Sequence, residues 1–127
     1  MIRTVPKRIM VVDDNPAIRR ALKNILEFTD GWVVCGEAVD GRDGIEKAQE
    51  LNPDLIVLDA SMPVMNGLEA ARVLRQIMPH VPLILCSLHT DDVLRKEASN
   101  AGVNAVVSKA QNIQTLIHRA QELLDNN

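Results

Sequence analysis

The sequence predicts an α/β protein in which a doubly wound parallel sheet of five strands carries helices on both faces. Two observations support this class. Apolar runs of strand length recur at nearly even intervals along the 127 residues, and the segments between them have helical spacing or end in helix-stop residues. Runs that are apolar throughout are typical of parallel strands buried on both faces, and strands that alternate with helices are typical of a doubly wound sheet.

The predicted strands are the apolar runs themselves. They cover Ile9–Val12, Val33–Ala38, Leu55–Leu58, Leu83–Cys86 and Ala105–Val107. The first and last helices have the clearest periodicity, because their apolar residues follow the spacing of a single helix face. These residues are Ile18, Ala21, Leu22, Ile25 and Leu26 in the first helix, and Ile113, Leu116, Ile117, Ala120 and Leu124 in the last.

Capping and stop residues mark where the helices begin and end. Asn15 is a suitable N-cap for the first helix, and Pro16 fits its first turn. The pair Asn52-Pro53 stops the second helix and Pro79 stops the third, while Gly102 suits the end of the fourth. We expect one domain, residues 1–127, with no linker and no internal repeat.

Composition excludes several classes of function. Lys and Arg number 14 against 17 Asp and Glu, which gives a net charge of −3 without a basic cluster. Nucleic-acid binding by this chain alone is therefore not expected. The N-terminus lacks the apolar stretch of a signal peptide, and no apolar run reaches membrane-spanning length. Cys35 and Cys86 lie inside apolar runs, where reduced core thiols are expected, so the sequence predicts a cytoplasmic protein without membrane contact.

Polar residues follow the predicted strands, at the sheet edge where ligands bind in this class of fold. They are Asp13 and Asp14 after the first strand, Asp59 after the third, Ser87 after the fourth, and Ser108 and Lys109 after the fifth. If the first and third strands are neighbours, the three carboxylates converge. Adjacent carboxylates resist burial unless water, hydrogen bonds or a cation satisfies them, and hard oxygen ligands suit Mg²⁺. Each acid taken alone could equally cap a helix or face solvent.

Four segments together resemble the receiver domain of bacterial response regulators, over essentially the whole chain. They are VVDD at Val11–Asp14, LIVLDASMPVMNG at Leu55–Gly67, LILCS at Leu83–Ser87 and VVSK at Val106–Lys109. The resemblance implies the flavodoxin-like strand order 2-1-3-4-5. It also implies a protein of two-component or phosphorelay signal transduction that accepts a phosphoryl group rather than an enzyme that turns over a substrate.

The resemblance assigns a role to each site residue. Asp59 matches the phosphoacceptor, Lys109 the phosphate-pairing amine and Ser87 the switch hydroxyl. Asp13 and Asp14 match the Mg²⁺-binding acids, with Asp59 and the backbone carbonyl of Ser61 completing the protein ligands. Two further positions modulate the site in relatives, and these match His89 and Val106 here.

The resemblance also implies partners. The phosphodonor is expected to be a sensor histidine kinase or a phosphotransfer protein. The signal is expected to pass to an output domain, or to a second copy of the chain, through the face formed by the fourth helix, fifth strand and fifth helix. A purely structural pseudo-receiver is the alternative, and retention of Asp13, Asp14, Asp59, Ser87 and Lys109 argues against it.

Three positions depart from the receiver pattern. Ala110 follows Lys109 where many receivers have a proline behind a cis peptide, so this bond is either trans or a strained cis bond. Such a residue is common in the subgroup that carries helix-turn-helix output domains. Ser87 replaces the commoner threonine, and Val106 stands where many receivers have an aromatic residue that moves in activation.

Three other functions fit the sequence less well. Gly36–Asp43 has the glycine spacing of a P-loop, but Arg42 and Asp43 occupy the places of the lysine and hydroxyl. Phosphatases of the haloacid dehalogenase type place a second Asp two residues after the nucleophile, where this chain has Ser61. A flavodoxin-like flavin carrier shares only the fold, and Phe28 and Trp32 are the sole aromatic residues available for stacking on a flavin.

Overall fold

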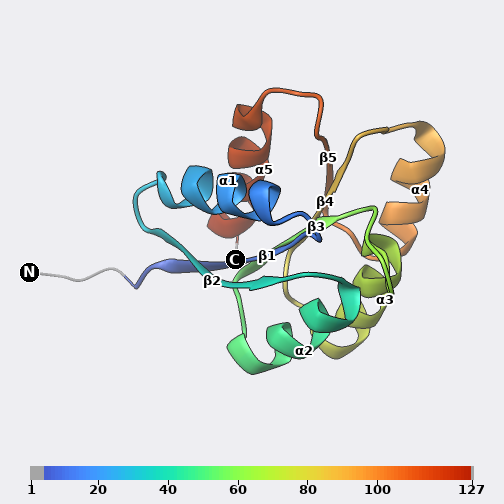
Figure 1. Cartoon of the computed structure of the whole chain (residues 1–127), viewed down its shortest axis with the longest axis horizontal. Helices are drawn as coiled ribbons and strands as arrows, with labels where there is room; N and C mark the ends of the chain where they lie inside the picture. Colours follow the sequence, from blue (N-terminus) through green and yellow to red (C-terminus); the bar gives the residue numbers. More distant parts are fainter. Residues whose placement is uncertain (1–4, 127) are drawn as a thin grey trace, which may run out of the picture.

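The computed structural model describes residues 5–126, which form five strands that alternate with five helices (Figure 1). In chain order the elements are β1 (Lys7–Val12), α1 (Pro16–Glu27), β2 (Trp32–Ala38), α2 (Gly41–Leu51), β3 (Leu55–Asp59), α3 (Gly67–Ile77), β4 (Leu83–Ser87), α4 (Asp92–Asn100), β5 (Ala105–Ser108) and α5 (Ile113–Asp125). Within this described part of the chain, none of the helices combines the length and apolar character needed to cross a bilayer.

The strands form one parallel sheet in the order β2-β1-β3-β4-β5, which confirms the predicted fold class and strand order. The chain leaves β1 toward β2 on one side and returns to β3 on the other. The carboxyl ends of β1 and β3 therefore lie side by side, with Val12 opposite Leu58. This is the point where the strand order reverses, and ligands bind at such a point in open α/β sheets.

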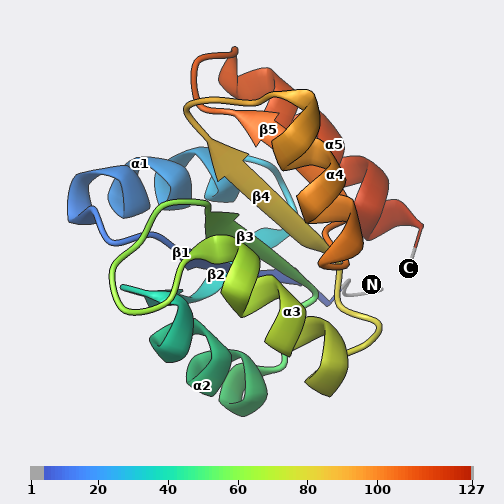
Figure 2. The ribbon, with the colours of Figure 1, turned by 90° about the vertical axis from the view of Figure 1, so that its right-hand side faces the viewer.

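Each face of the sheet buries its own apolar core, because successive side chains of a strand point to opposite faces. On β1, Met10 and Val12 belong to the core shared with α2, α3 and α4. Ile9 and Val11 belong to the core shared with α1 and α5. Figures 1 and 2 show these two groups of helices on opposite sides of the sheet. The sheet is therefore the middle layer of three, with helices covering both of its faces.

The capping residues lie where the sequence predicts them. The Asn15 side chain accepts hydrogen bonds from the backbone N–H groups of Ala17 at 2.9 Å and Ile18 at 3.3 Å, with Pro16 as the first helical residue of α1. Asn52 ends α2 in a left-handed conformation, and Gly102 (φ +87°) follows the last turn of α4 in the same conformation. These caps fix where α1 begins, and so how the chain leaves the end of β1.

Three strands extend one residue further than predicted, into the polar positions. Asp59 pairs with Cys86, and Ser87 pairs with Ser108, as the last rungs of the β3–β4 and β4–β5 ladders. The ladder uses backbone groups only, so a polar side chain does not end it. Asp59 and Ser87 are thus held by the sheet itself rather than by a loop.

The two cysteines are free, as predicted, but they differ in burial. Cys86 on the inner strand β4 is buried, and this burial raises the pKa of its thiol to about 12. Cys35 is only half-buried, because it lies on β2 at the edge of the sheet. The prediction of a core thiol is therefore confirmed for Cys86 and only partly correct for Cys35.

Candidate functional site

A cleft of about 370 Å³ lies at the carboxyl end of the sheet, over β1, β3 and β4. Seven of the eight predicted site residues line it, namely Asp13, Asp14, Asp59, Ser61, Ser87, His89 and Lys109. The other lining residues are Asn15, Ile18, Ala60 and Leu88. Val106, the eighth, lies instead on the sheet face toward α3 and α4, packed against the core.

Three carboxylates converge in the cleft. One oxygen from each of Asp13, Asp14 and Asp59 lies within 4.8 Å of the others. Asp13 and Asp59 are buried, with 1% and 5% of their surface exposed, whereas Asp14 faces solvent. The backbone N–H of Asn15 donates to Asp13 Oδ1 at 2.9 Å. The convergence predicted from the strand ends is therefore present.

Lys109 approaches this cluster from β5. Its Nζ lies 2.8 Å from Asp59 Oδ1 and 3.4 Å from Asp13 Oδ2. The backbone N–H of Lys109 donates to the carbonyl of Ser87 at 2.8 Å, which continues the β4–β5 ladder one residue past the strand. The ammonium is therefore positioned by the sheet and pairs with the two buried acids.

The electrostatics of the cluster are unbalanced. Burial raises the pKa of Asp13, and the charge of Asp59 raises it further, more than the Asn15 hydrogen bond and Lys109 lower it. For Lys109, burial lowers the pKa, but the hydrogen bond to Asp59 and the charge of Asp13 outweigh burial and leave it above its usual value. The acids thus favour more positive charge nearby than Lys109 provides.

The donor set fits a divalent cation. Three carboxylates face one ammonium, so the cluster has two more negative groups than positive ones. All donors are hard oxygens, which Mg²⁺ prefers, and the open cleft has room for the waters that this ion retains. Histidine and cysteine, which other metals favour, supply none of these donors.

The loop from β3 to α3 passes close to Asp59. The backbone N–H of Ser61 lies 3.4 Å from Asp59 Oδ1, at the edge of hydrogen-bonding distance. At Gly67, the first residue of α3, a Cβ atom would overlap the carbonyl oxygen of Asp59. Only glycine therefore lets α3 begin directly against the end of β3, and this packing holds Ser61 at the cleft.

Ser87 and His89 are bonded to each other. The Ser87 hydroxyl donates to the carbonyl oxygen of His89 at 3.0 Å, and the His89 N–H lies 3.3 Å from the same hydroxyl oxygen. Both residues line the cleft, and the His89 side chain is exposed. The peptide bond between Lys109 and Ala110 is trans, since the described chain contains no cis peptide, and this settles the alternative that the sequence left open.

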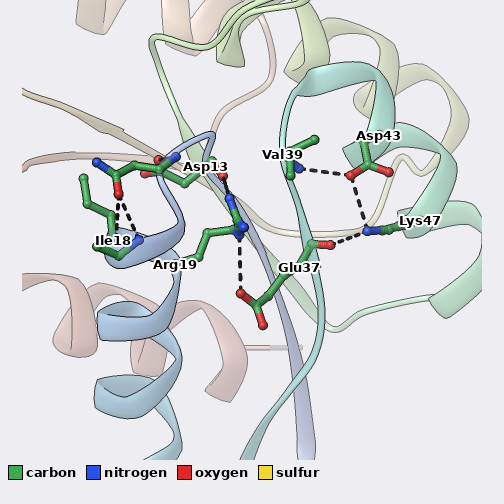
Figure 3. A network of polar contacts seen from close by, with 9 residues as sticks. Asp13, Ile18, Arg19, Glu37, Val39, Asp43 and Lys47 are labelled. Carbon is green, nitrogen blue, oxygen red and sulfur yellow. Dashed lines mark hydrogen bonds and ion pairs between the residues drawn. The ribbon is translucent and has the colours of Figure 1, made fainter.

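Sequence reasoning missed one residue that contacts the site. The Arg19 guanidinium donates to the backbone carbonyl of Asp13 at 2.7 Å and pairs with Glu37 on β2 at 3.4 Å (Figure 3). Arg19 and Arg20 are adjacent in the sequence and carry the same charge, so residue type does not distinguish the inward arginine from the outward one. The periodicity of α1 alone gives the only signal, because Arg19 lies beside Ile18 on the boundary of the buried face.

Comparison with known proteins agrees with this geometry. The model of the response regulator receiver domain family matches residues 9–121. The chemotaxis protein CheY of Thermotoga maritima is 38% identical over 103 residues, which cover 81% of this chain and 85% of CheY. The transcriptional regulatory protein YdfI of Bacillus subtilis is 31% identical over 94% of this chain, but the match covers only 56% of YdfI.

Solved structures give the same result. A two-component response regulator of the LuxR family from Aurantimonas sp. SI85-9A1 superposes with a TM-score of 0.92 at 28% identity, over 96% of this chain and 87% of that one. The response regulator domain of Thermotoga maritima CheB superposes with a TM-score of 0.88 at 29% identity, over 94% and 97%. The matched family model, the relatives and the fold agree: this chain belongs to the receiver domain family of two-component response regulators.

Proposed function

We propose that Asp59 accepts a phosphoryl group from the phosphohistidine of a sensor histidine kinase or phosphotransfer protein, in a reaction that requires Mg²⁺. One observation carries this proposal. The Asp59 carboxylate is buried at the end of β3, pairs with Lys109 at 2.8 Å, and lies beside two further acids in an open cleft. A nucleophile, a cation and a cation-binding acid pair are the parts that phosphoryl transfer requires.

The transfer moves one phosphoryl group between two proteins. A bond forms from an Asp59 carboxylate oxygen to phosphorus while the N–P bond of the phosphohistidine breaks, and its electron pair returns to the imidazole nitrogen. Catalysis of such a transfer is mostly positioning and neutralisation of the phosphoryl oxygens. Lys109 provides a positive charge 2.8 Å from the nucleophile and retains its proton, because its pKa is raised.

Mg²⁺, when bound, supplies the remaining positive charge on the phosphoryl oxygens. Asp13, Asp14, Asp59 and the backbone carbonyl of Ser61 would hold it. Asp13 contributes from a fixed position, since its N–H, its carbonyl oxygen and its Oδ1 each have a partner. Asp14 is exposed and completes the set from the solvent side.

The signal would leave the site through the loop after β4. The Ser87 hydroxyl, now bonded to His89, would exchange that partner for a phosphoryl oxygen and shift the start of α4. Val106 is short and has a single side-chain torsion, so it would not replace the moving aromatic residue of other receivers. His89 at the rim of the cleft would influence how fast phosphate is lost. The output surface would be the face of α4, β5 and α5, for an output domain or a second copy.

In this role the chain is a stoichiometric acceptor that assists its own phosphorylation and dephosphorylation, and not a turnover enzyme. We propose a cytoplasmic setting for this reaction, which agrees with the two free cysteines. A relative such as YdfI, of which this chain spans about half, is named as a transcriptional regulator. An output of that kind would have to come from a further domain or a partner, because the net charge of this chain is −3.

Labelling with a small phosphodonor tests the proposal. With acetyl phosphate and Mg²⁺, intact-mass measurement should find one added phosphoryl group that survives acid and is lost in base, as an acyl phosphate would be. Asp59→Asn should abolish labelling, because an amide is not a nucleophile toward phosphorus. Chelation of Mg²⁺ should also stop labelling, because the acids then repel the anionic donor.

Asp54→Asn is the matched control, because Asp54 lies just before β3, at the opposite end of the strand from Asp59. This variant should label like the wild type. The proposal is wrong if Asp59→Asn labels as fully as the wild type, or if labelling proceeds unchanged in a chelator.

A further inference from the structure

The peptide group that joins Asp13 to Asp14 is held by a side chain from α1. Arg19 Nη1 donates to the Asp13 carbonyl oxygen at 2.7 Å, and this carbonyl belongs to the peptide between the two acids. On its other side, the Asp13 N–H donates to the Ala38 carbonyl at 3.0 Å, where β1 pairs with β2. The backbone of Asp13 is therefore fixed from both directions at the point where the strand ends.

Arg19 is itself held in place. Its Nε lies 3.4 Å from Glu37 Oε1, and its side chain is only 16% exposed. The backbone carbonyl of Glu37 accepts a hydrogen bond from Lys47 Nζ at 2.6 Å, and Lys47 also pairs with Asp43 of α2. Figure 3 shows this series of contacts running from the end of β1 through α1 and β2 to α2.

We propose that Arg19, oriented by Glu37, is a positioning residue that sets the geometry of the acid pair Asp13 and Asp14 toward the cation. The inference rests on the proposed Mg²⁺ function and adds to it a residue outside the ligand set. A rotation of the Asp13–Asp14 peptide would carry the Asp14 carboxylate away from those of Asp13 and Asp59. The guanidinium opposes that rotation, because it donates a hydrogen bond to the Asp13 carbonyl while its ion pair with Glu37 holds it in place.

The sign of the effect separates positioning from charge. Arg19 is a cation near a cation site, so the Coulomb effect of removing it is tighter Mg²⁺ binding. Loss of positioning has the opposite effect, because the acids must then be ordered when the ion binds. Partners one contact removed from a metal ligand typically contribute about 10- to 100-fold in metal affinity. Positioning should therefore outweigh the charge effect, and Arg19→Gln should weaken binding.

A merely structural role predicts a different result. If Arg19 only attaches α1 to β2, its replacement lowers the stability of the fold and leaves the Mg²⁺ dissociation constant of the folded protein unchanged. Affinity, measured well below the unfolding transition, therefore distinguishes the two roles. Arg20 is the matched control, because it is the next residue of α1, carries the same charge and is exposed.

The experiment is an Mg²⁺ titration of the whole chain, followed by calorimetry and by amide chemical shifts, on the wild type and four variants. Arg19→Gln should weaken binding by about 10-fold or more, and Arg20→Gln should leave it unchanged or slightly tighter. Glu37→Gln should weaken binding less than Arg19→Gln. The double variant Arg19→Gln/Glu37→Gln should match Arg19→Gln within about twofold, because Glu37 acts through Arg19.

The outcomes are separable from those of the proposed function. If the wild type binds Mg²⁺ and Arg19→Gln binds equally well or more tightly, Arg19 has no positioning role, while the metal site stands. Equal weakening by Arg20→Gln would also overturn the inference, because the effect would not depend on the contact with Asp13. A wild type that does not bind Mg²⁺ overturns both. If Arg19→Gln fails to fold, Arg19→Lys decides the question, because it keeps the positive charge and removes the planar guanidinium, so that weaker Mg²⁺ binding then reports lost positioning and unchanged binding overturns the inference.

Discussion

Asp13 combines burial with negative charge, and this combination sets the energetics of the site. The residue is 1% exposed, its pKa is raised by burial and by Asp59, and Lys109 lies nearer to Asp59 than to Asp13. A buried charge that lacks full compensation destabilises the folded state. In the metal-free protein Asp13 therefore lowers the free energy of unfolding, and a bound cation would remove this destabilisation.

Replacing Asp13 by Asn should stabilise the metal-free protein and weaken Mg²⁺ binding. The amide keeps an oxygen for the Asn15 N–H, and Lys109 keeps its 2.8 Å contact with Asp59. The loss of one buried negative charge should therefore outweigh the loss of the longer 3.4 Å contact between Lys109 and Asp13 Oδ2. In a chelating buffer at neutral pH, the urea midpoint of Asp13→Asn should lie above that of the wild type. Asp14→Asn is the control, with a smaller effect on stability because Asp14 is exposed. A midpoint below the wild type would show that Asp13 is already fully compensated.

At the residue scale, the sequence predicted the chemistry of the cleft better than the support around it. Asp13, Asp59 and Lys109 could be found because each lies at a strand end, and parallel strands bring their carboxyl ends to one edge. Arg19 and Glu37 could not, because their contact depends on how α1 rotates over β2. Two adjacent arginines carry the same charge and the same helix propensity, and only tertiary packing gives one of them the Asp13 carbonyl.

At the scale of elements, the segment between β4 and α4 is the part of the site that has a second arrangement available. The Ser87 hydroxyl uses both its donor and its acceptor on His89, and the next residues of the loop lead to the Asp91 cap of α4. Leu88 and Val93 are exposed apolar side chains on either side of this cap. The loop is thus held by local hydrogen bonds and buries little apolar surface. Segments of this kind change conformation with a small change in free energy.

Ser87→Ala should separate phosphate uptake from the conformational response. Without the hydroxyl, nothing at this position can leave His89 for the phosphoryl oxygen, while Asp59 and Lys109 remain in place. Acetyl phosphate labelling should change by less than about 10-fold, the loss expected from one neutral hydrogen bond. The amide shifts that beryllofluoride induces between residues 88 and 93 should be largely lost.

Ser108→Ala is the control for this prediction, because Ser108 pairs with Ser87 at the end of β5 but does not line the cleft. It should keep the full response. The methyl groups of Val106 should shift little in any variant, since the side chain packs against the core. A normal loop response in Ser87→Ala, or a rotamer change at Val106 with a static loop, would contradict the proposed switch.

Element boundaries show where the sequence pattern reaches its limit. Helix ends marked by Asn15, Asn52 and Gly102 were predicted correctly. The Asn15 side chain accepts hydrogen bonds from the first turn of α1, and Asn52 and Gly102 adopt the left-handed conformation that few other residues adopt. The sequence placed the ends of β3 and β4 one residue early, before Asp59 and Ser87. The apolar run ends there, but the backbone hydrogen bonds of the sheet continue through these two polar residues. Polarity marks the rim of the core, and the backbone hydrogen bonds continue beyond that rim.

At the scale of the whole molecule, folding and cation binding are coupled. The three acids lie at the carboxyl ends of β1 and β3, which are adjacent in the sheet but separated in sequence by α1, β2 and α2. An unfolded chain does not hold these acids within 4.8 Å of one another, so the ion binds the native state far better than the unfolded one. Binding must therefore raise the free energy of unfolding.

The stability of the chain should rise with Mg²⁺ concentration by a defined amount. For one site, the gain is about 1.4 kcal/mol per tenfold increase in free Mg²⁺ above the dissociation constant. Trp32, the single tryptophan, is a suitable probe of urea unfolding. It is half-buried at the first rung of β2, opposite Lys7, so it lies at the end of the sheet away from the acids and reports unfolding rather than binding.

The control series uses NaCl at equal ionic strength, because salt screening alone changes the repulsion among the acids. In wild-type protein the Mg²⁺ series should rise above the NaCl series, and in Asp13→Asn/Asp59→Asn the two should coincide. If the free energy of unfolding of the wild type rises equally in the Mg²⁺ and NaCl series, the three acids hold no specific ion. The proposed Mg²⁺ requirement would then have to be abandoned. A slope near twice the one-site value would instead mean that a second ion binds the native fold. Asp14 is the one exposed acid of the cluster, and Asp14→Asn would then test whether the additional ion binds there.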